Sequence, residues 1–134
     1  MNTTHLKQIM TKIIGFNHLR GWHPLPQDIA KSIVIEAAEL LEHFQWDGGK
    51  NPVDKSKLDG KNITEIKFEV ADVFWYLTIF CHETGIDIVD ALEQKYKHNE
   101  EKYPEKMFAG KNNDEFYYAQ KKKYRQKQTT IIDK

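Results

Sequence analysis

The strongest constraint on the fold lies in residues 64–84, a mostly apolar run that carries carboxylates at helical spacing. On a helix, successive residues are about 100° apart. One narrow stripe of the run then holds Glu65, Glu69, Asp72, Tyr76 and Glu83. Apolar side chains flank this stripe on both sides, and a carboxylate among buried side chains is costly unless a cation or metal ion pairs with it. The run therefore predicts a bundled helix whose acidic groups face inward.

Three further helices are predicted from apolar residues that recur at three- and four-residue steps, over residues 4–19, 27–46 and 88–103. Thr64 and Asp87 are the expected N-caps of the third and fourth helices, because both can accept a hydrogen bond from the first helical turn. Strand-like alternation is scarce. We therefore predict an all-α chain with a four-helix-bundle-like fold.

Glycines and prolines separate the predicted helices. Gly21 and Gly85 are the expected stops of the first and third helices. The prolines within residues 22–26 predict an exposed loop that carries Trp22. The glycines and the proline within residues 47–62 predict a second loop.

Length and charge narrow the possible functions. The chain has 134 residues, and we expect one domain at 1–110 followed by a polar, basic extension at 111–134. Its 20 basic and 20 acidic residues leave no net charge to attract nucleic acid or a membrane surface. No apolar run reaches the roughly 20 residues that span a bilayer, so we expect a cytoplasmic protein. The basic run at 121–127 is either a solvated tail or an arm on a neighbouring subunit.

A second pair of carboxylates, Glu36 and Glu39, lies on the predicted helix at 27–46, where Glu36 borders the apolar stripe. If this helix packs antiparallel to the helix at 64–84, the two acidic pairs converge. Four carboxylates suit a hard divalent cation such as Mg²⁺, with Mn²⁺ as a substitute. A di-iron site ranks lower because its bundles use Glu-x-x-His pairs, which are missing at Glu36 and Glu69. A Mg²⁺ site predicts phosphate chemistry, and no glycine-rich phosphate loop offers another route.

The ordered set of residues 36–46 and 69–73 resembles the MazG-type all-α nucleoside triphosphate pyrophosphohydrolases, most closely their small dCTP-pyrophosphatase branch. The resemblance covers residues 4–104, including Arg20, Gly21 and Trp22. It implies Mg²⁺-dependent hydrolysis of a nucleoside triphosphate to the monophosphate and pyrophosphate, by attack of water on the α-phosphorus. The implied role is housecleaning of the nucleotide pool, with a pyrimidine, dCTP-like preference.

The resemblance also implies the site residues. The metal-binding and catalytic set would be Glu36, Glu39, Glu69 and Asp72. Substrate contacts would come from Trp22, Trp46, Tyr76, Lys95 and Asn99. Trp22 and Trp46 would enclose the base, and core packing is the alternative role for both.

The resemblance further implies a homodimer or homotetramer that completes the sites. Apolar residues outside the main helical stripes agree with burial by a partner subunit, namely Ile35, Phe74 and Cys81. Residues 23–28 depart from the usual loop of the family, which bears on the choice of base. Two alternative functions stay open: a non-catalytic helical protein-interaction module, and a dUTPase-like helical enzyme.

Overall fold

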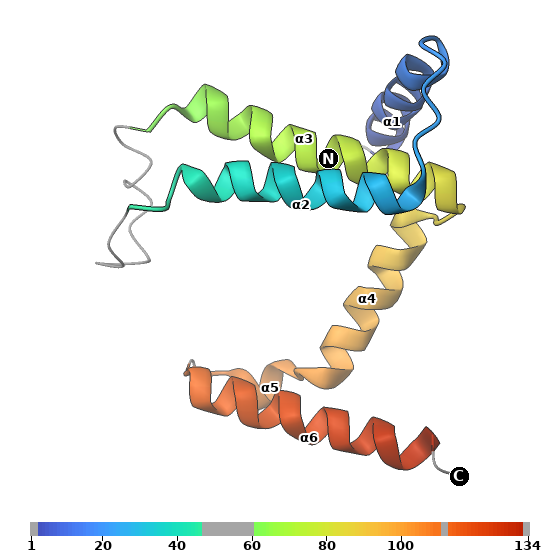
Figure 1. Cartoon of the computed structure of the whole chain (residues 1–134). Coiled ribbons are helices and arrows are strands. Elements are labelled where there is room, and N and C mark those ends of the chain that lie inside the picture. Colours follow the sequence, from blue (N-terminus) through green and yellow to red (C-terminus); the bar gives the residue numbers. More distant parts are fainter. Residues whose placement is uncertain (1–2, 47–60, 111–112, 133–134) are drawn as a thin grey trace. The chain divides into compact units, whose positions relative to one another are not determined.

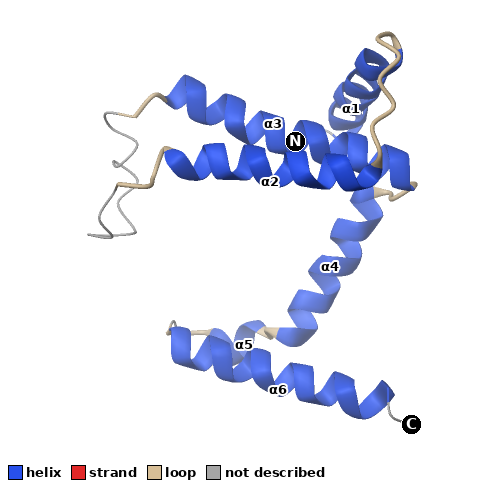
Figure 2. Ribbon diagram, in the orientation of Figure 1, coloured by secondary structure: helices blue, strands red, loops and turns tan. Residues whose placement is uncertain are grey.

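The computed structural model describes residues 3–46, 61–110 and 113–132. Within these ranges the chain forms helices and no strand, as Figure 2 shows. The helices are α1 (Thr3–His18), α2 (Pro26–Glu42), α3 (Ile63–Thr84), α4 (Ile88–Lys102), α5 (Glu105–Phe108) and α6 (Asp114–Ile132). The all-α prediction is confirmed. Residues 47–60 of the second predicted loop lie outside the described ranges. Among the described residues, no helix is long and apolar enough to cross a membrane.

The helix starts follow capping chemistry. The N-cap of α3 is Asn62, whose side-chain oxygen accepts hydrogen bonds from the backbone N–H groups of Thr64 at 3.2 Å and Glu65 at 3.3 Å. The prediction of Thr64 as the cap was therefore wrong by two positions, because Asn62 caps at least as well and Thr64 lies inside the first turn. Asp87 caps α4 as predicted.

The ends of the helices are also set by residues close to them in sequence. Gly21 and Gly85 have φ angles of 66° and 72°, the left-handed conformation that lets a helix stop. α2 ends at Glu42, four residues before the predicted end at Trp46. Its last turn tightens, because the Phe44 N–H donates to the Leu41 carbonyl at 2.9 Å, three residues back.

The chain forms two compact units, Met1–Ile86 and Asp87–Lys134. In the first unit, α2 and α3 lie side by side in opposite directions, and α1 packs on α3 (Figure 1). One isoleucine from each helix builds the core: Ile13, Ile29 and Ile79 are 5%, 1% and 3% exposed. Full burial of such a side chain contributes about 1.5–3 kcal/mol. These contacts fix how the carboxylates of α2 and α3 face one another.

In the second unit, α6 packs against α4. The Gln120 side chain donates a hydrogen bond to the Lys102 carbonyl at 2.9 Å, and the rings of Tyr103 and Tyr117 stack with 5.2 Å between centroids. The basic run at 121–127 therefore belongs to a helix, and five of its seven residues are exposed. The domain boundary after residue 110 and the role of an arm on a neighbouring subunit stay predictions.

Candidate metal centre

Three carboxylates meet between α2 and α3. One oxygen each from Glu36, Glu69 and Asp72 lies within 4.8 Å of the other two, and all three side chains are half-buried. Among the residues that the structure describes, this is the group of His, Cys, Asp or Glu side chains spaced to hold a metal ion. The fold thus brings together three of the four predicted ligands.

Helix geometry explains the meeting. Residues three apart on a helix are neighbours on its surface, so Glu69 and Asp72 project side by side from α3. Glu36 reaches them from α2 because the two helices pack along their lengths in opposite directions (Figure 1). Of the acidic stripe predicted to face inward, Glu69 and Asp72 are half-buried between the helices. Glu65 and Glu83, on the same helix, are exposed.

The electrostatics of the group favour a bound cation. Burial raises the pKa of the Glu36 carboxyl above its usual 4.5, and the negative charges of Glu39, Asp72 and Glu69 raise it further. No salt bridge from Lys, Arg or His reaches the three grouped carboxylates within the described part of the chain. Three half-buried negative charges without a protein counter-charge are costly, and a divalent cation between them would offset that cost.

Glu39 and Tyr76 flank the group. Glu39 lies three residues after Glu36 on α2 and is exposed, outside the group of three, although its charge acts on Glu36. Tyr76 follows Asp72 by one turn of α3, is half-buried and packs against the isoleucine core. Glu39 as a metal ligand and Tyr76 as a substrate contact stay predictions.

The other predicted substrate residues are exposed. Trp22, in the loop after α1, is 56% exposed, and Trp46, just after α2, is 87% exposed. Trp46 therefore does not belong to the core formed by the residues that the structure describes. Lys95 and Asn99 are exposed residues of α4 in the second unit. Contact between these four residues and a substrate stays a prediction.

An aromatic cluster around Phe16 was not predicted from the sequence. Its ring meets those of Trp22 and Trp75 edge to face, at centroid distances of 6.0 and 5.3 Å. The Arg20 guanidinium carbon lies 3.3 Å from the centroid of the Phe16 ring. The sequence does carry a signal for the contact between Arg20 and Phe16. The two residues are four apart at a helix end, a spacing that can place a cation over a ring.

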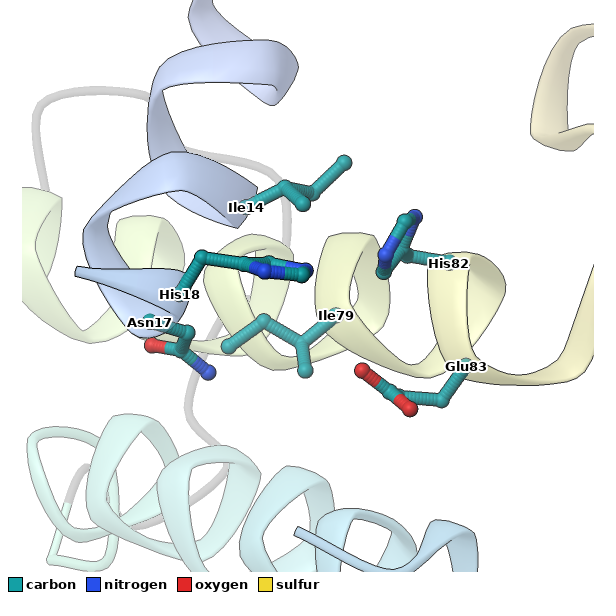
Figure 3. A pocket seen from close by; sticks show the side chains of 6 residues that line it. All are labelled: Ile14, Asn17, His18, Ile79, His82 and Glu83. Atoms are coloured by element: carbon teal, nitrogen blue, oxygen red, sulfur yellow. The ribbon is translucent and has the colours of Figure 1, made fainter. Parts of the chain in front are cut away.

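A shallow hollow lies between the C-terminal ends of α1 and α3 (Figure 3). Its lining consists of Ile14, Asn17, His18, Ile79, His82 and Glu83. The rings of His18 and His82 meet edge to face, 5.8 Å apart. A helix rises 1.5 Å per residue, so the lining residues of α3, from Ile79 to Glu83, lie about 10–16 Å from Asp72 along the helix. The hollow is therefore separate from the carboxylate group.

Comparison with known proteins points the same way as the geometry. The MazG-like family matches residues 31–116. A pyrophosphatase from Archaeoglobus fulgidus, known from a crystal structure, is 33% identical with a TM-score of 0.67, and the match covers 78% of this chain and 96% of that one. The dCTP pyrophosphatase 1 proteins of Mus musculus and Rattus norvegicus are each 27% identical over 93 residues, which is 68% of this chain. The matched part is 54% of the length of these two relatives.

The family match includes the three grouped carboxylates Glu36, Glu69 and Asp72, and it spans more than half of the chain. The structural match covers nearly all of the Archaeoglobus fulgidus protein, so the fold is shared as well. The chain belongs to the MazG-like family.

Proposed function

We propose that this protein hydrolyses a nucleoside triphosphate to the monophosphate and pyrophosphate, with Mg²⁺ as its cofactor. The observation that carries the proposal is the convergence of Glu36, Glu69 and Asp72 from two helices, with oxygens within 4.8 Å of one another. A triphosphate is strongly negative, and so is this group. A divalent cation is the species that both would bind. The relatives named above are all pyrophosphatases, which supports the same activity.

The residues present fit such an ion. Carboxylate oxygens are the ligands that Mg²⁺ prefers, and Mn²⁺ accepts the same ligands. Glu36, Glu69 and Asp72 would hold the ion, with Glu39 as a fourth ligand or as the group that orients the attacking water. When bound, the ion would neutralise the negative charge of the phosphate oxygens. Glu39 is exposed and lies outside the group of three, which leaves its oxygens available to accept a proton from water.

Trp22 and Trp46 are proposed to enclose the base, because both present large exposed rings. Tyr76, Lys95 and Asn99 are proposed to contact phosphate or sugar. A pyrimidine, dCTP-like preference is supported by the two relatives named dCTP pyrophosphatase 1. The role would be removal of unwanted nucleotides from the cytoplasmic pool.

A homodimer or homotetramer is proposed as the working form. Large apolar side chains of α2 and α3 are exposed, among them Val34 at 67%, Leu41 at 65% and Phe68 at 64%. Ile35, predicted to face a partner, is also 55% exposed. Cys81 gives no such support, because it is 7% exposed and belongs to the core of this chain.

The chemistry is tested by hydrolysis in ¹⁸O-labelled water, followed by mass spectrometry of both products. Attack on the α-phosphorus places the label in the monophosphate, and this is the expected result. Label in the pyrophosphate would show attack on the β-phosphorus. Release of single phosphates from the triphosphate end would contradict the proposed reaction altogether.

Substitution of the carboxylates tests their roles. Glu36→Gln, Glu69→Gln and Asp72→Asn should each lower kcat at least about 100-fold, the scale of loss for a group that acts at the reacting centre. Circular dichroism should remain that of the wild type. Glu42→Gln is the matched control, because Glu42 is an exposed residue of α2 outside the group. A grouped variant that keeps wild-type kcat would remove that residue from the site.

A further inference from the structure

The loop after α1 holds the backbone of Trp22 by a helix-stop motif. The carbonyl of Asn17 accepts hydrogen bonds from the N–H groups of Arg20 at 3.0 Å and Trp22 at 3.1 Å, and the Gly21 N–H donates to the His18 carbonyl at 3.0 Å. This is the hydrogen-bond pattern of a Schellman motif, with Gly21 in the left-handed conformation that it needs. The backbone of Trp22 is therefore fixed, while the residue remains 56% exposed.

The ring of Trp22 is oriented through Phe16. Trp22 contacts Phe16 at an interplanar angle of 67°, and Phe16 meets Trp75 of α3 at 85°. Arg20 covers the Phe16 ring at 3.3 Å, and its guanidinium also donates a hydrogen bond to the Phe16 carbonyl at 3.0 Å. Arg20 therefore contacts both the ring and the carbonyl of Phe16. The Phe16 ring in turn lies between Trp22 of the loop and Trp75 of α3.

The aromatic cluster lies close to the carboxylate group along α3. Trp75 is three residues after Asp72, a rise of about 4.5 Å along α3. The hollow begins at Ile79, about 10 Å from Asp72 on the same scale, and extends to Glu83, about 16 Å away. The aromatic cluster is therefore the nearer of the two candidate surfaces for the base of a bound nucleotide.

We propose that Arg20 is a positioning residue, which stacks on Phe16 and so holds the Trp22 ring at the angle that receives the base. This role rests on the proposed function, because that function assigns the base to Trp22. Without the guanidinium, the Phe16 ring loses the group that covers it and ties it to the helix end. Trp22 then keeps its backbone position but loses a fixed ring orientation.

Kinetics on the triphosphate that the wild type cleaves fastest test the proposal. Arg20→Met should raise KM about three- to fivefold, the size expected for loss of one cation–π contact near the surface, and leave kcat within about twofold. Arg20→Lys keeps the charge without the planar stack, so its KM should lie between those of the wild type and Arg20→Met. Lys7→Met removes an exposed cation from α1, the helix that precedes Arg20, away from Phe16, and should match the wild type.

Two kinetic results would overturn the proposal. One is an Arg20→Met enzyme with the KM of the wild type. The other is full rescue by Arg20→Lys together with an effect that disappears at high salt, since that would show that the charge of Arg20 attracts the phosphates instead.

A measurement without turnover separates this proposal from the proposed function. Protein labelled with 5-fluorotryptophan carries three ¹⁹F signals, from Trp22, Trp46 and Trp75, which single Trp→Phe variants assign. In Arg20→Met, the signals of Trp22 and Trp75 should shift or broaden while that of Trp46 stays unchanged. An unchanged Trp22 signal would overturn the positioning role. Failure of the wild type to cleave any triphosphate would instead overturn the proposed function, and with it the assignment of a base to Trp22.

Discussion

At the scale of one residue, the proposed role of Glu36 as a metal ligand conflicts with the stability of the metal-free protein. Its pKa is raised by burial first and then by three neighbouring carboxylates. A raised folded-state pKa means that the folded chain holds this proton to a higher pH than the unfolded chain does. Between the unfolded value, near 4.5, and the raised folded value, the free energy of unfolding therefore falls as pH rises.

Glu36→Gln should consequently stabilise the metal-free protein at neutral pH. The variant cannot ionise at this position, so its Tm should exceed that of the wild type at pH 7–8. The difference should vanish as the pH falls below about 4.5, where Glu36 is protonated in both states. Thermal unfolding in chelator across this pH range measures it. Addition of Mg²⁺ should reverse the order, because the wild type alone keeps the full ligand set.

A lower Tm for Glu36→Gln in chelator at pH 8 would contradict this description of the group. Glu42→Gln serves as the control, since the Glu42 side chain is exposed outside the group and should show no such pH-dependent gain.

At the scale of the elements, residue spacing predicted that three of the carboxylates meet. The i, i+3 spacing of Glu69 and Asp72 and the position of Glu36 on the apolar border of α2 indicated that these groups would meet. Spacing could not show that Glu39 lies outside the group of three, because this depends on how far each side chain reaches across the α2–α3 contact. It also could not show the Phe16 cluster, whose members come from α1, the following loop and α3.

The helical state of residues 114–132 was missed for a similar reason. Five of the residues at 121–127 are basic, a composition typical of a solvated tail. The stabilising contacts are distant in sequence: Phe116 packs on Phe108 with 4.9 Å between centroids, and Tyr124 meets His98 at 5.2 Å. Acidic residues in the first turn, Asp114 and Glu115, also suit the helix dipole.

The cap of α3 gives a prediction at this scale. Asn62→Ala removes the side-chain oxygen that accepts from two N–H groups of the first turn, so it should lower the free energy of unfolding by about 1 kcal/mol. Because α3 carries Glu69 and Asp72, weaker Mg²⁺ stabilisation should accompany the loss. Chemical denaturation with and without Mg²⁺ measures both effects.

Asn62→Asp is the matched control, since aspartate caps about as well as asparagine. If Asn62→Ala were as stable as the wild type, the two hydrogen bonds to the Asn62 side chain would contribute nothing to the start of α3.

At the scale of the whole molecule, the exposed apolar residues need an explanation. Val34 and Leu41 lie two turns apart on one face of α2, and 67% and 65% of their surfaces are exposed. A monomeric protein rarely leaves a contiguous apolar face in water. Burial by a second copy of the chain would remove this face from solvent.

The double variant Val34→Asp/Leu41→Asp should therefore shift the protein from an oligomer to a monomer in light scattering coupled to gel filtration. Charged side chains would make burial of the face costly. Lys31→Asp changes the charge of α2 at an exposed polar position and should leave the subunit count unchanged. An unchanged mass for the double variant would place the subunit contact on another face.

Pyrophosphate release from a panel of canonical and modified nucleoside triphosphates, measured with Mg²⁺ and with a chelator in its place, is the most direct test of the carboxylate group as a catalytic metal centre. The predicted result is release that requires Mg²⁺, is strongest for one pyrimidine nucleotide and is lost in Glu36→Gln. No release from any nucleotide by folded, Mg²⁺-loaded protein would contradict it, and would favour a helical interaction module that keeps the fold of the family without its reaction.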